Sequence, residues 1–234
     1  MALGASKVGP VTTAPDADLA FLYRETRERL SELVLGLDDS ERATSVPACP
    51  GWAVSDVLCH LLAVVEDVMA GRLTKPPSDA ETAAQVARHR GTPVPALIET
   101  WAELAPPFEE LVGAADVWPA VLDVASHEQD IRGALGRQGA RDTEVVRAGA
   151  ERLVTMLQPP VPVRLVCDDF EARVGPDDAE APELVLRTTH FETFRWRLGR
   201  RSRAQVRGFD WSADPGPVMD QLFIFGPSPT DIAE

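Results

Sequence analysis

Apolar residues recur at intervals of three and four through the first two-thirds of the chain, which is typical of helices that bury one face. This pattern predicts helices over residues 16–37, 54–71, 81–90, 94–113, 119–135 and 144–157. Pro106 and Pro107 should kink or split the fourth of these helices, because proline lacks the backbone N–H that a helix interior needs. Together these helices predict an antiparallel bundle.

The pattern changes after the proline-rich segment 159–162, which is the expected domain boundary. Beyond it, the sequence predicts strands over residues 163–167, 170–174, 183–187 and 204–209, and helices over residues 189–199 and 217–223. We therefore predict an α+β fold. Its expected parts are a flexible N-terminus (residues 1–15), an N-terminal antiparallel four-helix bundle (residues 16–158) and a small C-terminal α+β domain (residues 163–228).

Charge and composition argue against several classes of function. The net charge of −14 would repel a phosphate backbone, so we expect no nucleic-acid partner. Residues 1–15 lack the apolar core of a secretory signal, and no later segment approaches the ~20 apolar residues of a membrane span. Three irregularly placed cysteines do not make a disulfide framework. We expect a soluble cytoplasmic protein with no membrane partner, either a monomer or a homodimer.

Two histidines and one aspartate are candidates for a metal site. Asp123 and His127 are four residues apart in a predicted helix, so both project from one face among apolar neighbours. Buried polar groups need partners, and a divalent metal between facing helices is one solution in bundles. His60, at the edge of the apolar stripe of another helix, can supply a third ligand. Two histidines and one carboxylate leave coordination positions open, as a catalytic site requires. Spacing alone leaves an alternative open, in which His127 is a core histidine and Asp123 its hydrogen-bond partner or a surface acid.

Three segments resemble motifs of one protein family. They are residues 47–61 (PACPGWAVSDVLCHL), residues 123–136 (DVASHEQDIRGALG) and residues 198–211 (LGRRSRAQVRGFDW). The first two resemble motifs of the mycothiol-dependent maleylpyruvate isomerase-like family, actinobacterial relatives of the DinB-like metal-binding bundles. The third is similar to a C-terminal signature of one large subgroup. The resemblance implies a DinB-like four-helix bundle followed by a small α+β domain, and it makes His60 and His127 metal ligands.

The sequence departs from the family pattern at two positions. The second motif normally contributes a Glu and a His four residues apart, and Asp123 stands in place of the Glu. Its shorter side chain implies looser coordination or a closer helix. Ala53 stands where relatives often have Ser or Thr, which removes a good N-cap from the helix that carries His60.

The resemblance also implies a chemistry. It implies zinc, with nickel as an alternative, and mycothiol, a small thiol, as cosubstrate. A metal-bound thiol loses its proton near neutral pH, and the thiolate could add to an electrophilic substrate. The product would come from isomerisation of a double bond or from S-transfer. Arg200, Arg201 and Arg207 are candidates for binding an anion of the substrate or thiol cofactor. Alternatively, this arginine run joins the two domains.

Two other classes of function stay open at this point. One is a non-catalytic metal- or ligand-binding protein of the same fold, which the substitution at Asp123 favours. The other is a helical interaction module without a metal. We assign Cys49 and Cys59 to packing and not to catalysis, since a buried cysteine behaves as a small apolar residue.

Overall fold

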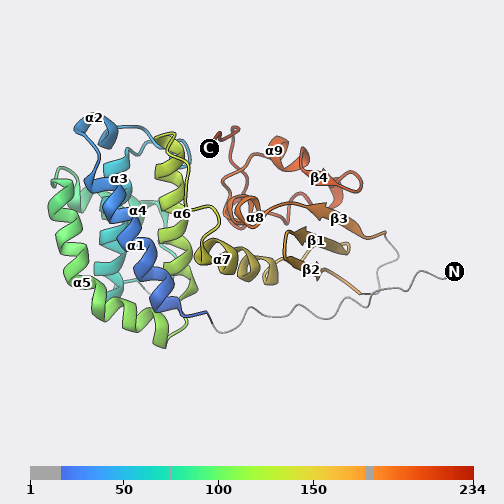
Figure 1. Cartoon of the computed structure of the whole chain (residues 1–234), viewed down its shortest axis with the longest axis horizontal. Coiled ribbons are helices and arrows are strands. Elements are labelled where there is room, and N and C mark those ends of the chain that lie inside the picture. The colour runs from blue at the N-terminus through green and yellow to red at the C-terminus, as the bar shows by residue number, and fades with distance from the viewer. Residues whose placement is uncertain (1–16, 74, 178–181) are drawn as a thin grey trace. The chain divides into compact units, whose positions relative to one another are not determined.

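The computed structural model describes residues 17–73, 75–177 and 182–234, and it confirms the predicted α+β fold class. Helices make up the N-terminal part, and the strands form a small sheet in the C-terminal part (Figure 1). The segment predicted to be flexible, residues 1–15, lies outside the described residues. None of the described helices combines the length and the apolar character that crossing a membrane requires.

The described residues form two compact units. One unit contains residues 17–141 together with the last two residues of the chain, and the other contains residues 142–232. The predicted helix over residues 144–157 therefore belongs with the sheet and not with the bundle. A boundary between independently folding domains at residues 158–163 stays a prediction.

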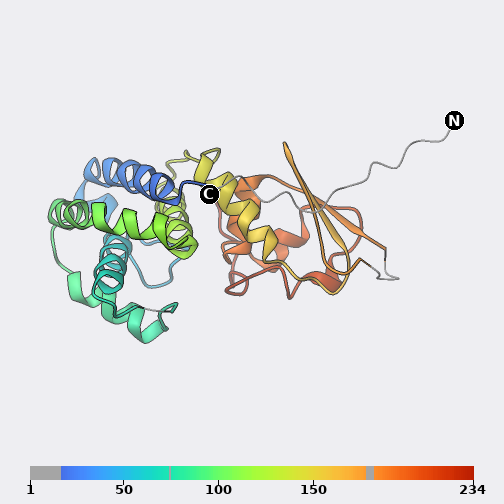
Figure 2. The ribbon, with the colours of Figure 1, turned by 90° about the horizontal axis from the view of Figure 1, so that it is seen from below.

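The first unit is the helical bundle (Figure 1). Its helices are α1 (Leu19–Leu35), α2 (Asp39–Arg42), α3 (Val54–Met69), α4 (Asp79–His89), α5 (Val94–Ala114) and α6 (Trp118–Ala134). Both α1 and α3 pack against α5 and α6, and the views from the side and from below agree that α1 lies beside α5 (Figure 2). The long helices α1, α3, α5 and α6 thus form the predicted four-helix bundle, and α4 packs on α3.

Large aromatic side chains hold α1 and α5 together. Trp101 is 1% exposed, and its indole Nε1–H donates to the hydroxyl of Tyr23 at 3.1 Å. The ring of Tyr23 meets that of Phe108 edge-on, with centroids 5.0 Å apart. Because a buried indole N–H needs an acceptor, this contact sets the register of the two helices as well as filling the core.

The prolines inside α5 do not split it. The helix continues from Val94 to Ala114 through Pro106 and Pro107, although a proline in a helix interior costs about 3 kcal/mol. Ala105 and Phe108 on either side are each 1% exposed. Burial of this face against α1 and α3 offsets the hydrogen bonds that the prolines remove.

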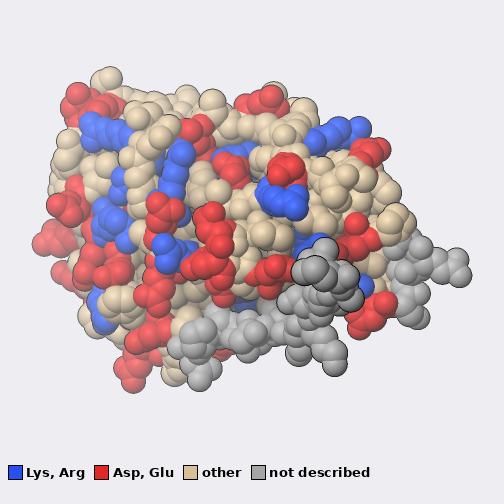
Figure 3. All heavy atoms as spheres, turned by 45° about the vertical axis from the view of Figure 1, so that its right-hand side comes forward, with Lys and Arg blue, Asp and Glu red and all other residues tan. Residues whose placement is uncertain are grey.

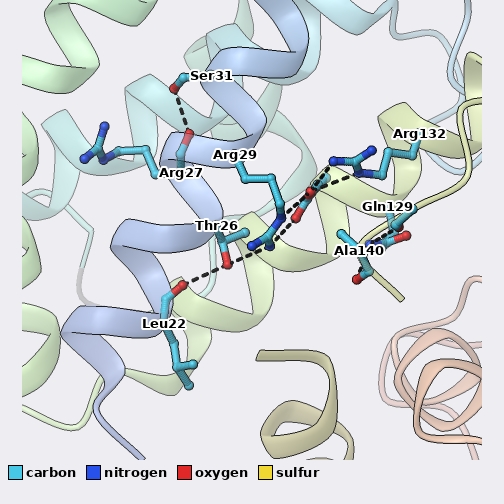
Figure 4. Close-up of polar contacts among 10 residues, drawn as sticks. Leu22, Thr26, Arg27, Arg29, Ser31, Gln129, Arg132 and Ala140 are labelled. Carbon is cyan, nitrogen blue, oxygen red and sulfur yellow. Dashed lines mark hydrogen bonds and ion pairs between the residues drawn. The ribbon is translucent and has the colours of Figure 1, made fainter. Parts of the chain in front are cut away.

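Glu128 of α6 is the centre of a buried ion-pair network. Glu128 is 1% exposed. Its carboxylate accepts hydrogen bonds from Arg29 Nε at 2.8 Å, from Arg29 Nη2 at 2.6 Å and from Arg132 Nε at 2.9 Å. Arg29 also donates to the hydroxyl of Thr26, which donates to the carbonyl of Leu22. Figure 4 shows the side chains of Arg29 from α1 and Arg132 from α6 pointing toward one another. The network ties α1 to α6.

The second unit is a small sheet with helices. Its elements are α7 (Glu144–Thr155), β1 (Val163–Cys167), β2 (Phe170–Val174), β3 (Leu184–Arg187), α8 (His190–Arg197), α9 (Arg203–Arg207), β4 (Asp210–Trp211) and a 3₁₀ turn, η1 (Gly216–Val218). The strand order is β2-β1-β3-β4, with β1 and β3 parallel and the outer pairs antiparallel. Trp196 of α8 is fully buried in the core that this sheet covers.

Two predictions for the second unit are wrong. Residues 204–209 were expected to form a strand, but the chain forms helix α9 there. The reason is local, because Ser202 and Gln205 make a reciprocal capping box that starts a helix. The helix expected over residues 217–223 is reduced to the turn η1.

Charged side chains of both signs share the surface. On the face drawn in Figure 3, Lys and Arg side chains lie interspersed with Asp and Glu side chains. Independently of this view, ion pairs among the described residues include Arg42–Asp39 at 3.3 Å and Arg164–Glu183 at 3.0 Å. Figure 3 thus shows basic side chains mixed with acidic ones on this face, and the absence of a nucleic-acid partner stays a prediction.

Candidate metal centre

Helices α3 and α6 bring the three predicted ligands together. The Nε2 atom of His60 lies 3.6 Å from Asp123 Oδ2, and the Nε2 atom of His127 lies 3.5 Å from Asp123 Oδ1. One ligand atom from each of the three residues lies within 4.8 Å of the others. The two histidines are each 5% exposed. The structure therefore forms a compact cluster of two imidazoles and one carboxylate inside the bundle.

Local structure explains this placement. Asp123 and His127 are one turn apart on α6, so both side chains project toward α3, against which α6 packs. The N-terminus of α3, which precedes His60, has no side-chain cap from Ala53. The carboxylate of Asp56 compensates by accepting from the backbone N–H of Ala53 at 3.0 Å. The expected loss of an N-cap is thus partly replaced from within the first turn.

Trp52 forms one wall of the cluster. Its ring centroid lies 5.2 Å from that of His60 and 6.3 Å from that of His127. A backbone hydrogen bond from Val46 N to the carbonyl of Trp52, 2.9 Å long, holds the turn that presents the indole. The side chain of Asp123, by contrast, is 32% exposed. The two imidazole rings are therefore largely shielded from solvent, while the Asp123 carboxylate side is partly exposed.

The second nitrogen of each imidazole has its own partner. His127 Nδ1 lies 3.0 Å from Asp130 Oδ2, and His60 Nδ1 lies 3.2 Å from Gln85 Oε1. The thiol of Cys49 also donates to Asp130 Oδ2, at 3.5 Å. Histidines that bind metals usually donate their other ring N–H in this way, which orients the ring. Both Nε2 atoms are left facing Asp123.

Electrostatics in the cluster favour charged groups. Burial by itself raises the pKa of Asp123, but the two imidazoles outweigh it and hold that pKa well below the ordinary range. Burial lowers the pKa of His127, but the carboxylates of Asp123 and Asp130 outweigh it and raise that pKa well above 6.5. Without a metal, His127 is therefore an imidazolium paired with carboxylates, and a bound cation would take the place of its proton.

The donor set fits a divalent metal. The gaps of 3.6 and 3.5 Å between imidazole nitrogens and the carboxylate exceed the usual 2.7–3.2 Å or so of an N–H···O hydrogen bond. Bonds of about 2.0–2.2 Å from one ion to nitrogen and oxygen ligands would span gaps of this size. Two imidazoles and one carboxylate suit zinc or nickel and leave positions for further ligands.

Metal affinity is expected to fall as the pH falls. A metal must displace the proton of His127, so the affinity should drop about tenfold for each pH unit below the raised pKa of this group. The folding stability of the metal-free protein should instead fall as the pH rises. Protonated His127 contributes its full stabilisation of the folded state below about pH 6.5, the pKa of an unfolded histidine, and this contribution disappears as the pH rises through the raised pKa. Dye competition measures the metal affinity and thermal unfolding measures the stability of the metal-free protein, both between pH ~6 and ~9. Metal affinity and metal-free stability that change with pH in the same direction would contradict the role of His127 as a ligand that is protonated when no metal is bound.

Sequence reasoning missed several residues of the cluster. Asp130 stands in the quoted second motif, three residues after His127, so a helical wheel could have placed it beside that ring. Cys49 and Trp52 stand in the first motif, but Cys49 was assigned to packing and Trp52 was given no role at the metal site. Gln85 carries no such signal, because it lies 25 residues from His60 and on another helix.

The three predicted anion-binding arginines lie in the second unit. Arg201 is bound bidentately by Glu192, with Nε and Nη2 at 2.7 and 2.9 Å from the carboxylate. Arg200 donates to the carbonyl of Leu198, and Arg207 of α9 is exposed. Anion binding by Arg200, Arg201 and Arg207 stays a prediction.

Another arginine of the same run has a structural role. The guanidinium of Arg197 donates to the carbonyls of Leu153 and Leu222, at 3.1 and 2.5 Å. It therefore ties α8 to α7 and to the C-terminal segment within the second unit.

The chain is similar to known proteins in sequence pattern and in fold. A family model described as the mycothiol maleylpyruvate isomerase N-terminal domain matches residues 23–145. A crystal structure of the mycothiol-dependent maleylpyruvate isomerase has a TM-score of 0.51 and 14% identity, covering 88% of this chain and 96% of that one. A histidine-to-alanine mutant of that isomerase has a TM-score of 0.53 and 14% identity, covering 82% and 92%. At this identity the likeness concerns the fold. Among curated proteins, none matches the sequence.

Proposed function

Because the chain belongs to the family of the mycothiol maleylpyruvate isomerase N-terminal domain, we propose that it is a metal-dependent enzyme that activates a small thiol. The thiol would attack an electrophilic substrate. As an isomerase, the protein would catalyse addition of the thiol to a double bond and its later departure; as an S-transferase, it would leave the thiol bonded to the substrate. The observation that carries the proposal is the cluster of His60, Asp123 and His127, buried on the imidazole side and open on the carboxylate side.

The residues of the cluster have distinct roles in this proposal. A divalent metal bound here would lower the pKa of a thiol that binds it, so that the thiol reacts as a thiolate. His60 and His127 provide neutral nitrogen donors whose rings are held by Gln85 and Asp130. Asp123 supplies a carboxylate ligand whose negative charge would offset the charge of a bound cation. The indole of Trp52 lies against the two rings and would help shield a bound metal from solvent.

The proposal includes zinc, with nickel as an alternative, and mycothiol as cosubstrate. The donor set suits both ions, and the likeness to mycothiol-dependent proteins supports the thiol. A thiol cosubstrate persists in a reducing compartment, so we place the protein in the cytoplasm. Its three cysteines, Cys49, Cys59 and Cys167, are free, which supports this placement.

Of the three arginines, Arg207 best fits the proposed contact with an anion. It is exposed on α9, and a guanidinium can bind a carboxylate through two hydrogen bonds. Arg201 already uses this geometry to bind Glu192.

A second candidate function is a metal- or ligand-binding protein without turnover. It is favoured by Asp123, whose side chain is one carbon shorter than the Glu of the family motif. A shorter ligand would hold a cation without presenting it in a geometry suited to reaction.

Thiol chemistry separates the two candidates. Metal-loaded protein is expected to catalyse either loss of free mycothiol with an epoxide or cis–trans isomerisation of maleylpyruvate without net loss of thiol. Free thiol and substrate absorbance measure the two reactions. Chelator-treated protein and His60→Ala are the controls, and both should reduce the rate at least about 100-fold. Metal-loaded protein that accelerates neither reaction would favour the second candidate.

A further inference from the structure

The imidazole of His60 is connected to a carboxylate through a single amide side chain. His60 Nδ1 lies 3.2 Å from Gln85 Oε1, and Gln85 Nε2 donates to Asp67 Oδ2 at 2.9 Å. Gln85 comes from α4 and is 2% exposed, while Asp67 comes from α3 and is 7% exposed. These groups are shielded from water, so each hydrogen bond restricts the next.

Asp67 can only accept hydrogen bonds. Two guanidiniums contact its Oδ1 atom, Arg72 Nη2 at 2.7 Å and Arg88 Nη2 at 2.9 Å. Burial raises the pKa of Asp67, but hydrogen bonds from Gln85 and the two arginines outweigh it and hold that pKa below its ordinary value. The carboxylate is thus ionised at neutral pH, and an ionised carboxylate has no proton to donate.

An acceptor at one end determines the direction of the whole chain of hydrogen bonds. Asp67 requires the NH₂ group of Gln85, so the amide oxygen of Gln85 faces His60. That oxygen can only accept, and therefore the proton of a neutral His60 lies on Nδ1. The lone pair of the ring is then on Nε2, the atom that faces Asp123 at 3.6 Å.

We propose that Gln85 and Asp67, together called the relay below, are positioning residues that fix the tautomer of His60, so that its Nε2 lone pair can bind a metal. The inference rests on the metal centre of the proposed function. Without these residues, the nearby carboxylate of Asp123 would favour the opposite tautomer, with the proton on Nε2. His127 needs no such relay, because Asp130 contacts its Nδ1 atom directly.

The chain offers a matched control for the relay. Glu66, next to Asp67 on α3, also binds α4, through Arg88 at 2.9 Å and His89 at 2.8 Å, but these contacts do not involve Gln85. Glu66→Gln therefore weakens the packing of α4 on α3 without reversing the amide. Asp67→Asn weakens it similarly and also supplies a donor, which allows the amide of Gln85 to turn around. Gln85→Leu keeps the volume of the side chain and removes the acceptor.

Two measurements test the proposal. Long-range ¹H–¹⁵N spectra of metal-free protein, at a pH where the spectra show His60 to be neutral, should report the Nδ1–H tautomer in wild type and in Glu66→Gln. Asp67→Asn and Gln85→Leu should shift the population toward Nε2–H. In dye competition, the dissociation constant for Zn²⁺ should rise about 10- to 100-fold in Gln85→Leu, rise less in Asp67→Asn and stay unchanged in Glu66→Gln.

The outcomes separate the relay from the proposed function. An unchanged tautomer and unchanged Zn²⁺ affinity in Gln85→Leu would overturn the relay, as would equal losses in Asp67→Asn and Glu66→Gln. Wild-type protein that fails to bind Zn²⁺ would instead refute the proposed function. In that event the spectra of metal-free protein still decide the relay, because they need no metal.

Discussion

Wild-type protein expressed without a polyhistidine tag is expected to contain close to one equivalent of divalent metal, and His60→Ala and His127→Ala are each expected to lose it. Each substitution leaves two ligands from the chain where three converge within 4.8 Å. Losing a residue that merely orients a ligand typically costs 10- to 100-fold in affinity, so losing the ligand itself should cost at least about 100-fold. Elemental analysis of the purified proteins measures the metal content.

His89→Ala is the control for this experiment. His89 is a partly buried histidine that pairs with Glu66 at 2.8 Å and lies outside the cluster of ligands. Its substitution should leave the metal content unchanged, and circular dichroism should show that all variants are folded. Folded wild-type protein that stays metal-free after incubation with zinc and nickel would eliminate the proposed metal centre.

Glu128→Gln is expected to lower the free energy of unfolding by about 3 kcal/mol. The carboxylate of Glu128 is buried and accepts hydrogen bonds from both Arg29 and Arg132. A neutral amide of the same shape leaves two guanidiniums without their anion and places an NH₂ group against one of them. Removing one partner of a buried ion pair is costly for this reason. Urea unfolding of the metal-free protein measures the change.

Glu41→Gln provides the comparison with an exposed ion pair. Glu41 contacts Arg137, and the two side chains are 30% and 42% exposed. Solvent and salt screen such a pair, so the expected loss is within about 1 kcal/mol. Similar losses of unfolding free energy for Glu41→Gln and Glu128→Gln would contradict the idea that burial makes the Glu128 ion pairs more stabilising than an exposed pair.

Helix positions followed closely from the sequence because helical periodicity is local. The predicted helix over residues 54–71 corresponds to α3 at Val54–Met69, and the one over residues 119–135 corresponds to α6 at Trp118–Ala134. Local rules failed where other interactions outweighed them. Residues 204–209 read as a strand, but the capping box at Ser202 starts a helix. Packing of α5 overrides the break expected at Pro106 and Pro107.

By itself, the sequence determined the α+β class, the bundle and the shared face of Asp123 and His127, because these depend on spacing within single helices. The sequence and its family resemblance suggested His60 as their third ligand, but only the tertiary structure placed it beside them, since α3 and α6 meet through packing between segments far apart in the chain. The tertiary structure alone placed Gln85 of α4 behind His60. A hydrogen bond between residues on different helices leaves no periodic trace in the sequence, and it forms only when packing brings the two side chains together.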